Sequence, residues 1–192
     1  FFRERVSAVL SGRDLSAILE QVFGKLGRPM PADSDTLREI IAAVSHCDGL
    51  NLCSLKSRII DLLILLDSDR ESFTAAAKIM ERTGNIIKSA SVEAGKIEDG
   101  LLREAAEKEL ARAFASVEGQ VRGLLSEKNY LQGLKLYADA LSGPVTAFFD
   151  TVLVNCPEED LRGNRQRLMK AIFVLPCAHI GNLAALAAKG VS

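Results

Sequence analysis

Residues 144–169, PVTAFFDTVLVNCPEEDLRGNRQRLM, decide how this chain folds. They begin with a short apolar helix that carries the adjacent Phe148 and Phe149 and continues into an apolar tail at residues 152–154. A turn follows, and Pro157 opens a helix whose first turn is acidic and whose later turns are basic. Acidic side chains at the start of a helix and basic ones further along suit its dipole, so this charge pattern supports a helix that begins here. The stretch is predicted to be two helices joined by a short segment.

The rest of the chain also has helical character. Apolar residues recur at spacings of three and four, strand-like alternation is scarce, and only 5% of the residues are aromatic. One segment is apolar on most of its sides, which predicts a buried central helix. These patterns predict an all-α protein, a helical bundle. Its expected helices cover about residues 1–10, 14–26, 37–44, 52–66 (the buried one), 70–88, 101–125 and 129–141, then one from 143–144 and a last one from 157.

Polar residues mark two of the expected helix starts. Ser34 or Asp35 is expected to cap the helix at residues 37–44. Ser68, with Glu71 three residues later, has the pattern of a capping box for the helix that follows it.

Composition and proline mark two further boundaries. Composition changes near residues 67–68, so we expect a helical lead-in over residues 1–66 and a helical bundle over residues 67–192. Pro176 lacks the amide that a helix interior needs and is expected to kink the last helix.

The bulk composition indicates a folded protein without a membrane span. Hydrophobic residues make up 48% of the 192 residues, but no stretch long enough to cross a bilayer lacks charge. The opening sequence FFRERV is no signal peptide, and without an initiator Met it indicates a piece of a longer polypeptide. Four cysteines without C-x-x-C spacing favour reduced thiols in a cytosolic protein. A net charge of −1 limits any nucleic-acid contact to a local patch.

Four stretches of the chain, in the same order, resemble the bacterial glycyl-tRNA synthetase beta subunit. The longest of them resembles the carboxy-terminal end of that family. The stretches are FFRERV at residues 1–6; Phe73 followed by Arg82, Asn85 and Ile86; residues 104–110; and P-V-x-x-F-F-D-x-V-x-V at 144–154 with L-R-x-N-R at 161–165.

This resemblance implies an all-helical anticodon-binding domain of the DALR type, as also found in arginyl-tRNA synthetase, over residues 67–192. It implies a cytoplasmic parent enzyme of two alpha and two beta subunits, in which the alpha subunit activates glycine with ATP and Mg²⁺. The beta subunit is then expected to recognise tRNA(Gly). The chain departs from the family pattern at Glu81, where Lys is usual, at Gln166, where Leu is usual, and at residues 178–181, where A-D-F-S is usual.

Two rows of polar side chains are the candidate tRNA contacts. Each row has helical spacing and is expected to point away from the core, where cations and amides suit the phosphates and base edges of an unstacked loop. The alternative, an ordinary solvated helix face, remains open for both rows, as does the question of whether they converge. The 162–170 row is Arg162, Gln166 and Lys170, and the 78–85 row is Lys78, Arg82 and Asn85.

Other conspicuous polar residues are interpreted first as structural. Asn164 and Arg165 fall at the edges of the apolar arc of the last helix. Asn164 is expected to satisfy backbone groups, and Arg165 to pair with a carboxylate such as Asp150. On the long helix before them, Arg103 and Glu107 are expected to form a solvent-exposed i,i+4 pair.

Most aromatic side chains are expected in the core. Phe148 and Phe149 are adjacent and point about 100° apart on a helix, so one of them is expected to be partly exposed. Tyr130 and Tyr137 share one helix face and could stack on bases, although helix packing is the favoured interpretation.

No catalytic or metal-binding constellation accompanies these features. His46, Cys47 and Cys53 lack a zinc spacing, and Cys177 and His179 point to different sides of the last helix. No glycine-rich phosphate loop is present. The segment is therefore expected to contribute binding to its parent ligase and no catalytic residue of its own. The alternative is a non-catalytic helical module that docks a partner subunit, which the near-zero net charge suits equally well.

Overall fold

The computed structural model describes an all-α protein, as the sequence predicts. It describes residues 19–20, 23–24, 27, 29–30, 32–45, 52–88, 90 and 95–187, and within these ranges no residue lies in a β-strand. The expected helix at residues 1–10 lies outside them, and so does most of the one at 14–26. Residues 19–20 and 23–24 are helical, and the helices with defined bounds are α3 (Ser34–Ser45), α4 (Leu52–Ser68), α5 (Arg70–Lys88), α6 (Ala105–Ser126), α7 (Tyr130–Thr151) and α8 (Glu159–Cys177), with short 3₁₀ helices η1 (Asp99–Leu101) and η2 (Ala184–Leu186).

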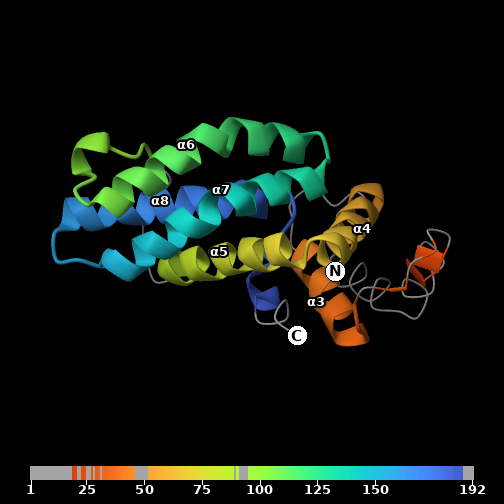
Figure 1. Cartoon of the computed structure of the whole chain (residues 1–192). Helices are drawn as coiled ribbons and strands as arrows, with labels where there is room; N and C mark the ends of the chain where they lie inside the picture. The colour runs from red at the N-terminus through yellow and green to blue at the C-terminus, as the bar shows by residue number, and fades with distance from the viewer. Residues whose placement is uncertain are drawn as a thin grey trace.

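Helices α5 to α8 form a bundle (Figure 1). Helices α6 and α7 are an antiparallel pair joined by a short turn, and α5 packs along the other side of α7. Helix α8 packs against both α5 and α6. Helices α3 and α4 lie at one end of the bundle, and the connection between α7 and α8 lies at the opposite end (Figure 1). The apolar core is continuous from α3 and α4 into the bundle; the expected division at residues 66–67 stays a prediction.

Helix α4 is the buried central helix that its apolar pattern predicts. It packs against α3, α5 and α7. No helix in the described ranges is long and apolar enough to cross a bilayer. The buried α4 side chains include Leu55, Ile59, Leu62, Leu63, Leu65 and Leu66.

The helix-capping predictions were wrong in detail, although α5 has the predicted bounds. Asp33 caps α3, because its Oδ1 accepts the backbone N–H of Thr36 at 2.6 Å. Asp69 caps α5 by accepting the backbone N–H of Ser72 at 3.1 Å. Ser68 belongs to the end of α4, where its hydroxyl donates to the carbonyl of Ile64. In both cases an aspartate in the connecting segment reaches the free amides of the first turn, which is the preferred chemistry of an N-cap.

Helix α7 is continuous where two separate helices were expected. Pro144 lies inside it and removes one backbone hydrogen bond. Leu141, Val145 and Phe148, on one face of α7, are at most 1% exposed. Packing of this face on both sides of the proline compensates for the missing bond, so the local rule for proline does not decide the outcome.

Helix α8 ends at Cys177, and the expected kinked continuation was wrong. Pro176 lies in its last turn, and His179 follows in a turn outside the helix. The chain then turns back at Gly181, whose φ is +111°. A Cβ atom at Gly181 would overlap the carbonyl oxygen of Ala43 in α3. Glycine is therefore required there both by the backbone angle and by the close approach.

We expect Gly181→Ala to lower the free energy of unfolding by about 2 kcal/mol or more, because the substitution adds both strain and overlap. The matched control is Gly119→Ala on α6, where nothing lies within 4 Å of an added Cβ. The control is expected to raise stability by about 0.4–1 kcal/mol, since it lowers the entropy of the unfolded chain. Urea unfolding midpoints measure both. Equal effects of the two substitutions would contradict the close approach.

Candidate nucleic-acid interface

A buried ion pair connects α6 to α8 next to the candidate interface. Glu107 Oε1 accepts a hydrogen bond from Nε of Arg165, and the two side chains are 0% and 6% exposed. Glu107 Oε2 accepts the backbone N–H groups of Arg103 at 2.6 Å and Glu104 at 3.0 Å. The expected exposed pair of Arg103 and Glu107 was therefore wrong, because Glu107 points into the protein and bonds the Arg103 backbone.

Asn164 and Arg165 have the structural roles that were predicted for them. Arg165 pairs with a carboxylate, although the partner is Glu107 and not Asp150. Its Nη1 also donates to the carbonyl of Leu153 at 2.8 Å, which fixes the segment between α7 and α8. Asn164 is buried and clamps the backbone of Glu98, accepting its N–H at 2.8 Å and donating to its carbonyl at 3.0 Å.

The 162–170 row lies half-buried along α8. Nη1 of Arg162 donates to the carbonyls of Cys156 at 2.9 Å and Pro157 at 3.2 Å. The side-chain amide of Gln166 donates to Asn155 Oδ1 at 2.9 Å. Two members of the row are thus held against the connection that precedes α8. Their side chains are therefore more restricted than those on an ordinary solvated helix face.

The 78–85 row lies on α5, beside the end of α7. Lys78 and Asn85 are exposed, and Asn85 Oδ1 accepts a hydrogen bond from Lys88. The guanidinium of Arg82 lies over the ring of Phe149, 4.5 Å from its centroid. It also lies 3.9 Å from Asp150.

The aromatic predictions were confirmed. Phe148 is fully buried, while Phe149 is partly exposed and makes an edge contact with it. Tyr130 and Tyr137 are buried, and the hydroxyl of Tyr137 donates to the carbonyl of Ile172 at 3.2 Å. Neither tyrosine is placed to stack on a nucleobase.

Members of both rows contact residues 149–157, which are the end of α7 and the connection that follows it. Arg82 contacts the start of this segment at Phe149 and Asp150, whereas Arg162 and Gln166 contact its end. Leu153, in the middle of this segment, is 67% exposed. The candidate interface therefore consists of the two rows and the connection between α7 and α8.

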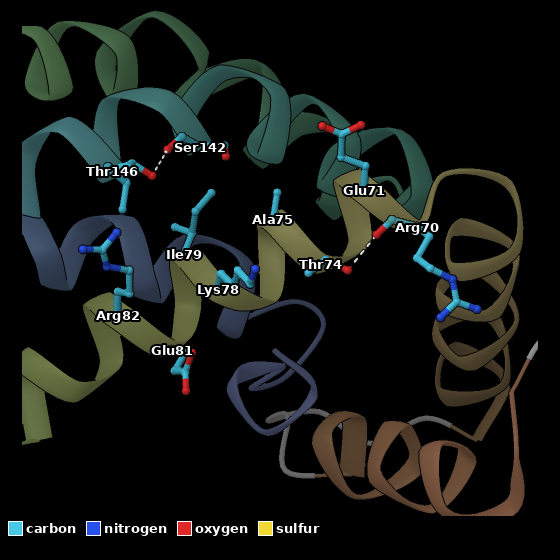
Figure 2. Close-up of a pocket in the computed structure, with 11 residues that line it drawn as sticks. Arg70, Glu71, Thr74, Ala75, Lys78, Ile79, Glu81, Arg82, Ser142 and Thr146 are labelled. Atoms are coloured by element: carbon cyan, nitrogen blue, oxygen red, sulfur yellow. Dashed lines mark hydrogen bonds between the residues drawn. The ribbon is translucent and has the colours of Figure 1, made fainter. Parts of the chain in front are cut away.

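A groove between α5 and α7 adds residues that the sequence analysis missed. It is a cavity of about 600 Å³ that includes Lys78 and Arg82 of the 78–85 row (Figure 2). Its further polar residues include Arg70, Ser142 and Thr146. In the sequence, only the small size of Ala75 and Ser142 could have indicated a groove. The groove can be recognised only when α5 and α7 are known to lie side by side.

In the described part of the chain, no three His, Cys, Asp or Glu side chains gather as a metal site would need. Burial raises the pKa of the Cys177 thiol. Burial, followed by the nearby charges of Arg122 and Arg58, lowers the pKa of His179. A raised thiol pKa disfavours the thiolate that a nucleophile needs. His46 and Cys47 lie outside the described residues.

Comparison with known proteins places the chain in a family, although no family model matches it. The glycine–tRNA ligase beta subunit of Methylobacillus flagellatus is 32% identical over 160 residues, which cover 82% of this chain and 22% of that protein. The one from Janthinobacterium sp. (strain Marseille) is 30% identical over 164 residues, covering 85% and 23%. The one from Leptothrix cholodnii is 42% identical over 100 residues, covering 51% and 14%. The chain belongs to the glycine–tRNA ligase beta subunit family.

The family resemblance read from residues 144–165 and the other stretches was therefore correct. The chain spans between 14% and 23% of the length of these glycine–tRNA ligase beta subunits. The DALR-type assignment and the six predicted tRNA contacts stay predictions.

Removing one partner of the Glu107–Arg165 pair should destabilise the protein strongly. We expect Arg165→Met to cost about 3–5 kcal/mol, because it leaves a buried carboxylate without its cation. The double variant with Glu107→Gln should cost less than the sum of the single variants. The control Arg112→Met removes an exposed pair with Glu109 and should cost about 1 kcal/mol or less. If urea unfolding gave the two single arginine variants the same midpoint, the structural role of Arg165 would be wrong.

The fall in the free energy of unfolding at acid pH should depend in part on Asp69, whose side chain connects the start of α5 to α7. The hydrogen bond from Lys135, followed by that from the Ser72 backbone N–H, lowers the pKa of Asp69. Its stabilisation is therefore complete above the ordinary carboxyl pKa of about 4 and is lost as the pH falls through the lower folded value. Asp69→Asn should lower the free energy of unfolding at neutral pH and flatten its decline in acid. Parallel urea-unfolding profiles of wild type and variant between neutral and acidic pH would contradict this.

Proposed function

We propose that this chain binds the anticodon stem-loop of glycine tRNA, and that it thereby supports ATP-dependent glycylation of tRNA(Gly) in protein synthesis. The observation that carries the proposal is the kinship with proteins named glycine–tRNA ligase beta subunit. The two rows beside residues 149–157 supply a surface with suitable chemistry. Arg162, Gln166, Lys170, Lys78, Arg82 and Asn85 are the proposed contacts.

The chemistry of these side chains suits an open RNA loop more than a duplex. A loop is recognised by stacking and by hydrogen bonds to base edges, with few phosphate clamps. A net charge of −1 agrees with few phosphate contacts. Arg162 is held in place by Nη1, which leaves Nε and Nη2 as donors for a phosphate or a base edge. An arginine that is already held loses less conformational entropy on binding.

The rest of the proposed mechanism lies outside this chain. Binding of the cognate loop would hold the acceptor end near a distant active site, where an alpha subunit activates glycine with ATP and Mg²⁺. Interactions with the correct tRNA then raise specificity without bond chemistry at this site. The proposed partners are tRNA(Gly) and the alpha subunit of a tetramer with two copies of each subunit, in the cytoplasm.

Loss of two cations from the 162–170 row should weaken RNA binding and its salt dependence together. We expect Arg162→Ala with Lys170→Ala to lower affinity for a glycine tRNA anticodon stem-loop and to reduce the salt slope by about one for each lost phosphate contact. Fluorescence anisotropy of the labelled stem-loop at several salt concentrations measures both quantities.

The matched control is Lys108→Ala with Arg112→Ala, which removes the same charge from exposed positions on α6. Unchanged binding in the first double variant would remove Arg162 and Lys170 from the interface. If the chain bound an alpha subunit but no tRNA, the docking-module interpretation would replace the proposed function.

A further inference from the structure

The groove between α5 and α7 combines an apolar floor with a polar rim. Ile79 and Val145, which are at most 2% exposed, meet the half-buried Ala75 at its floor. Ser142 and Thr146 contribute hydroxyls from α7 (Figure 2). The cavity of about 600 Å³ falls within the range of about 300–1,000 Å³ typical of small-molecule sites.

The charges around the groove are unevenly distributed. Lys78 and Arg82 lie at the same stretch of α5 as Thr146 of α7, whereas Glu71 lies toward the other end (Figure 2). Glu81 and Arg70 also line the groove, with side chains directed away from the space between α5 and α7 (Figure 2). Arg82 is already 3.9 Å from Asp150, so Lys78 is the cation that favours an anionic group at this end of the groove, and Glu71 disfavours one at the other end.

The hydroxyl of Thr146 has only acceptor capacity left. It donates its own hydrogen to the carbonyl of Ser142 at 2.9 Å. A hydroxyl that has donated its hydrogen still accepts through its lone pairs. A ligand edge beside Thr146 is therefore matched when it presents an N–H group.

We propose that this groove holds one unstacked ribonucleotide of the bound RNA, with its base on Ala75, Ile79 and Val145 and its phosphate at Lys78. The inference rests on the proposed function and adds to it a subsite, a nucleotide orientation and a preference for a base that offers an N–H to Thr146. The flat face of a base suits an aliphatic floor, and removal of that face and of Ala75 from water favours binding. Arg82 lines the groove and lies over the ring of Phe149.

The test fills the groove without changing charge. In the 192-residue chain, Ala75→Met places a longer apolar side chain in the hollow, and it is expected to weaken binding of the glycine tRNA anticodon stem-loop about tenfold. The control Ala115→Met makes the same change at an exposed position on α6 and should leave the affinity unchanged. Fluorescence anisotropy gives the affinities, and circular dichroism verifies that both variants are folded.

A second measurement identifies the nucleotide. Stem-loops with an abasic sugar at each loop position in turn are titrated against wild type and Ala75→Met. At one loop position the abasic substitution should lower the affinity for wild type, and the same substitution should not lower the affinity for Ala75→Met any further.

A stem-loop whose base at that position lacks an N–H should bind wild type less tightly, and Thr146→Val should reduce this difference in affinity. A stem-loop carrying 4-thiouridine there should crosslink to residues 70–82 or 142–146 of wild type, which tests the site even if Ala75→Met fails to fold.

The outcomes separate this inference from the proposed function. If the stem-loop binds wild type and Ala75→Met equally while the Arg162 and Lys170 double variant binds weakly, RNA binding stands and the groove is not its subsite. Crosslinks confined to other segments would overturn the subsite in the same way. If wild type binds no stem-loop at all, the proposed function fails, and the subsite fails with it.

Discussion

The buried pair of Glu107 and Arg165 is the interaction on which the arrangement of the interface depends. Burying a carboxylate is costly unless its oxygens are paired and hydrogen-bonded. Here Oε2 accepts two backbone N–H groups at the start of α6, and Oε1 accepts Nε of Arg165. Through Nη1, Arg165 also binds the carbonyl of Leu153. One carboxylate thus sets the start of α6, the position of α8 and the path of the segment that members of both polar rows contact.

Signals that act within one or two helical turns could be read from the sequence. The apolar character of residues 52–66 predicts the buried α4, and the bounds of α5 agree with its periodicity. The burial of Tyr137 and the structural roles of Asn164 and Arg165 also follow from their places on an apolar arc. The partner of Arg165 could not be read, because Glu107 lies 58 residues away and is adjacent only after α6 and α8 pack.

The region around Pro144 shows how tertiary packing overrides a local rule. A proline after a glycine favours a break, yet the buried face of α7 continues through it. Ser142, one turn before Thr146, is small and leaves space beside Ala75 of α5. The groove is therefore a property of two helices together. The 78–85 row was identified from α5 alone, whereas the polar residues that face it across the groove belong to α7.

The placement of the cations is what the proposed RNA-binding surface requires of a nearly neutral protein. Surface pairs such as Arg122 with Glu118 are exposed, so solvent and salt screen them. Arg162 differs, because two backbone carbonyls hold its side chain in place, whereas Arg82 is held by an aromatic ring and lies 3.9 Å from the exposed carboxylate of Asp150. A held cation retains its attraction for an anion and pays little entropy when the anion arrives. In the proposed function, selectivity for an open loop depends on the position of a few cations beside apolar surface, and the total charge of the chain matters little.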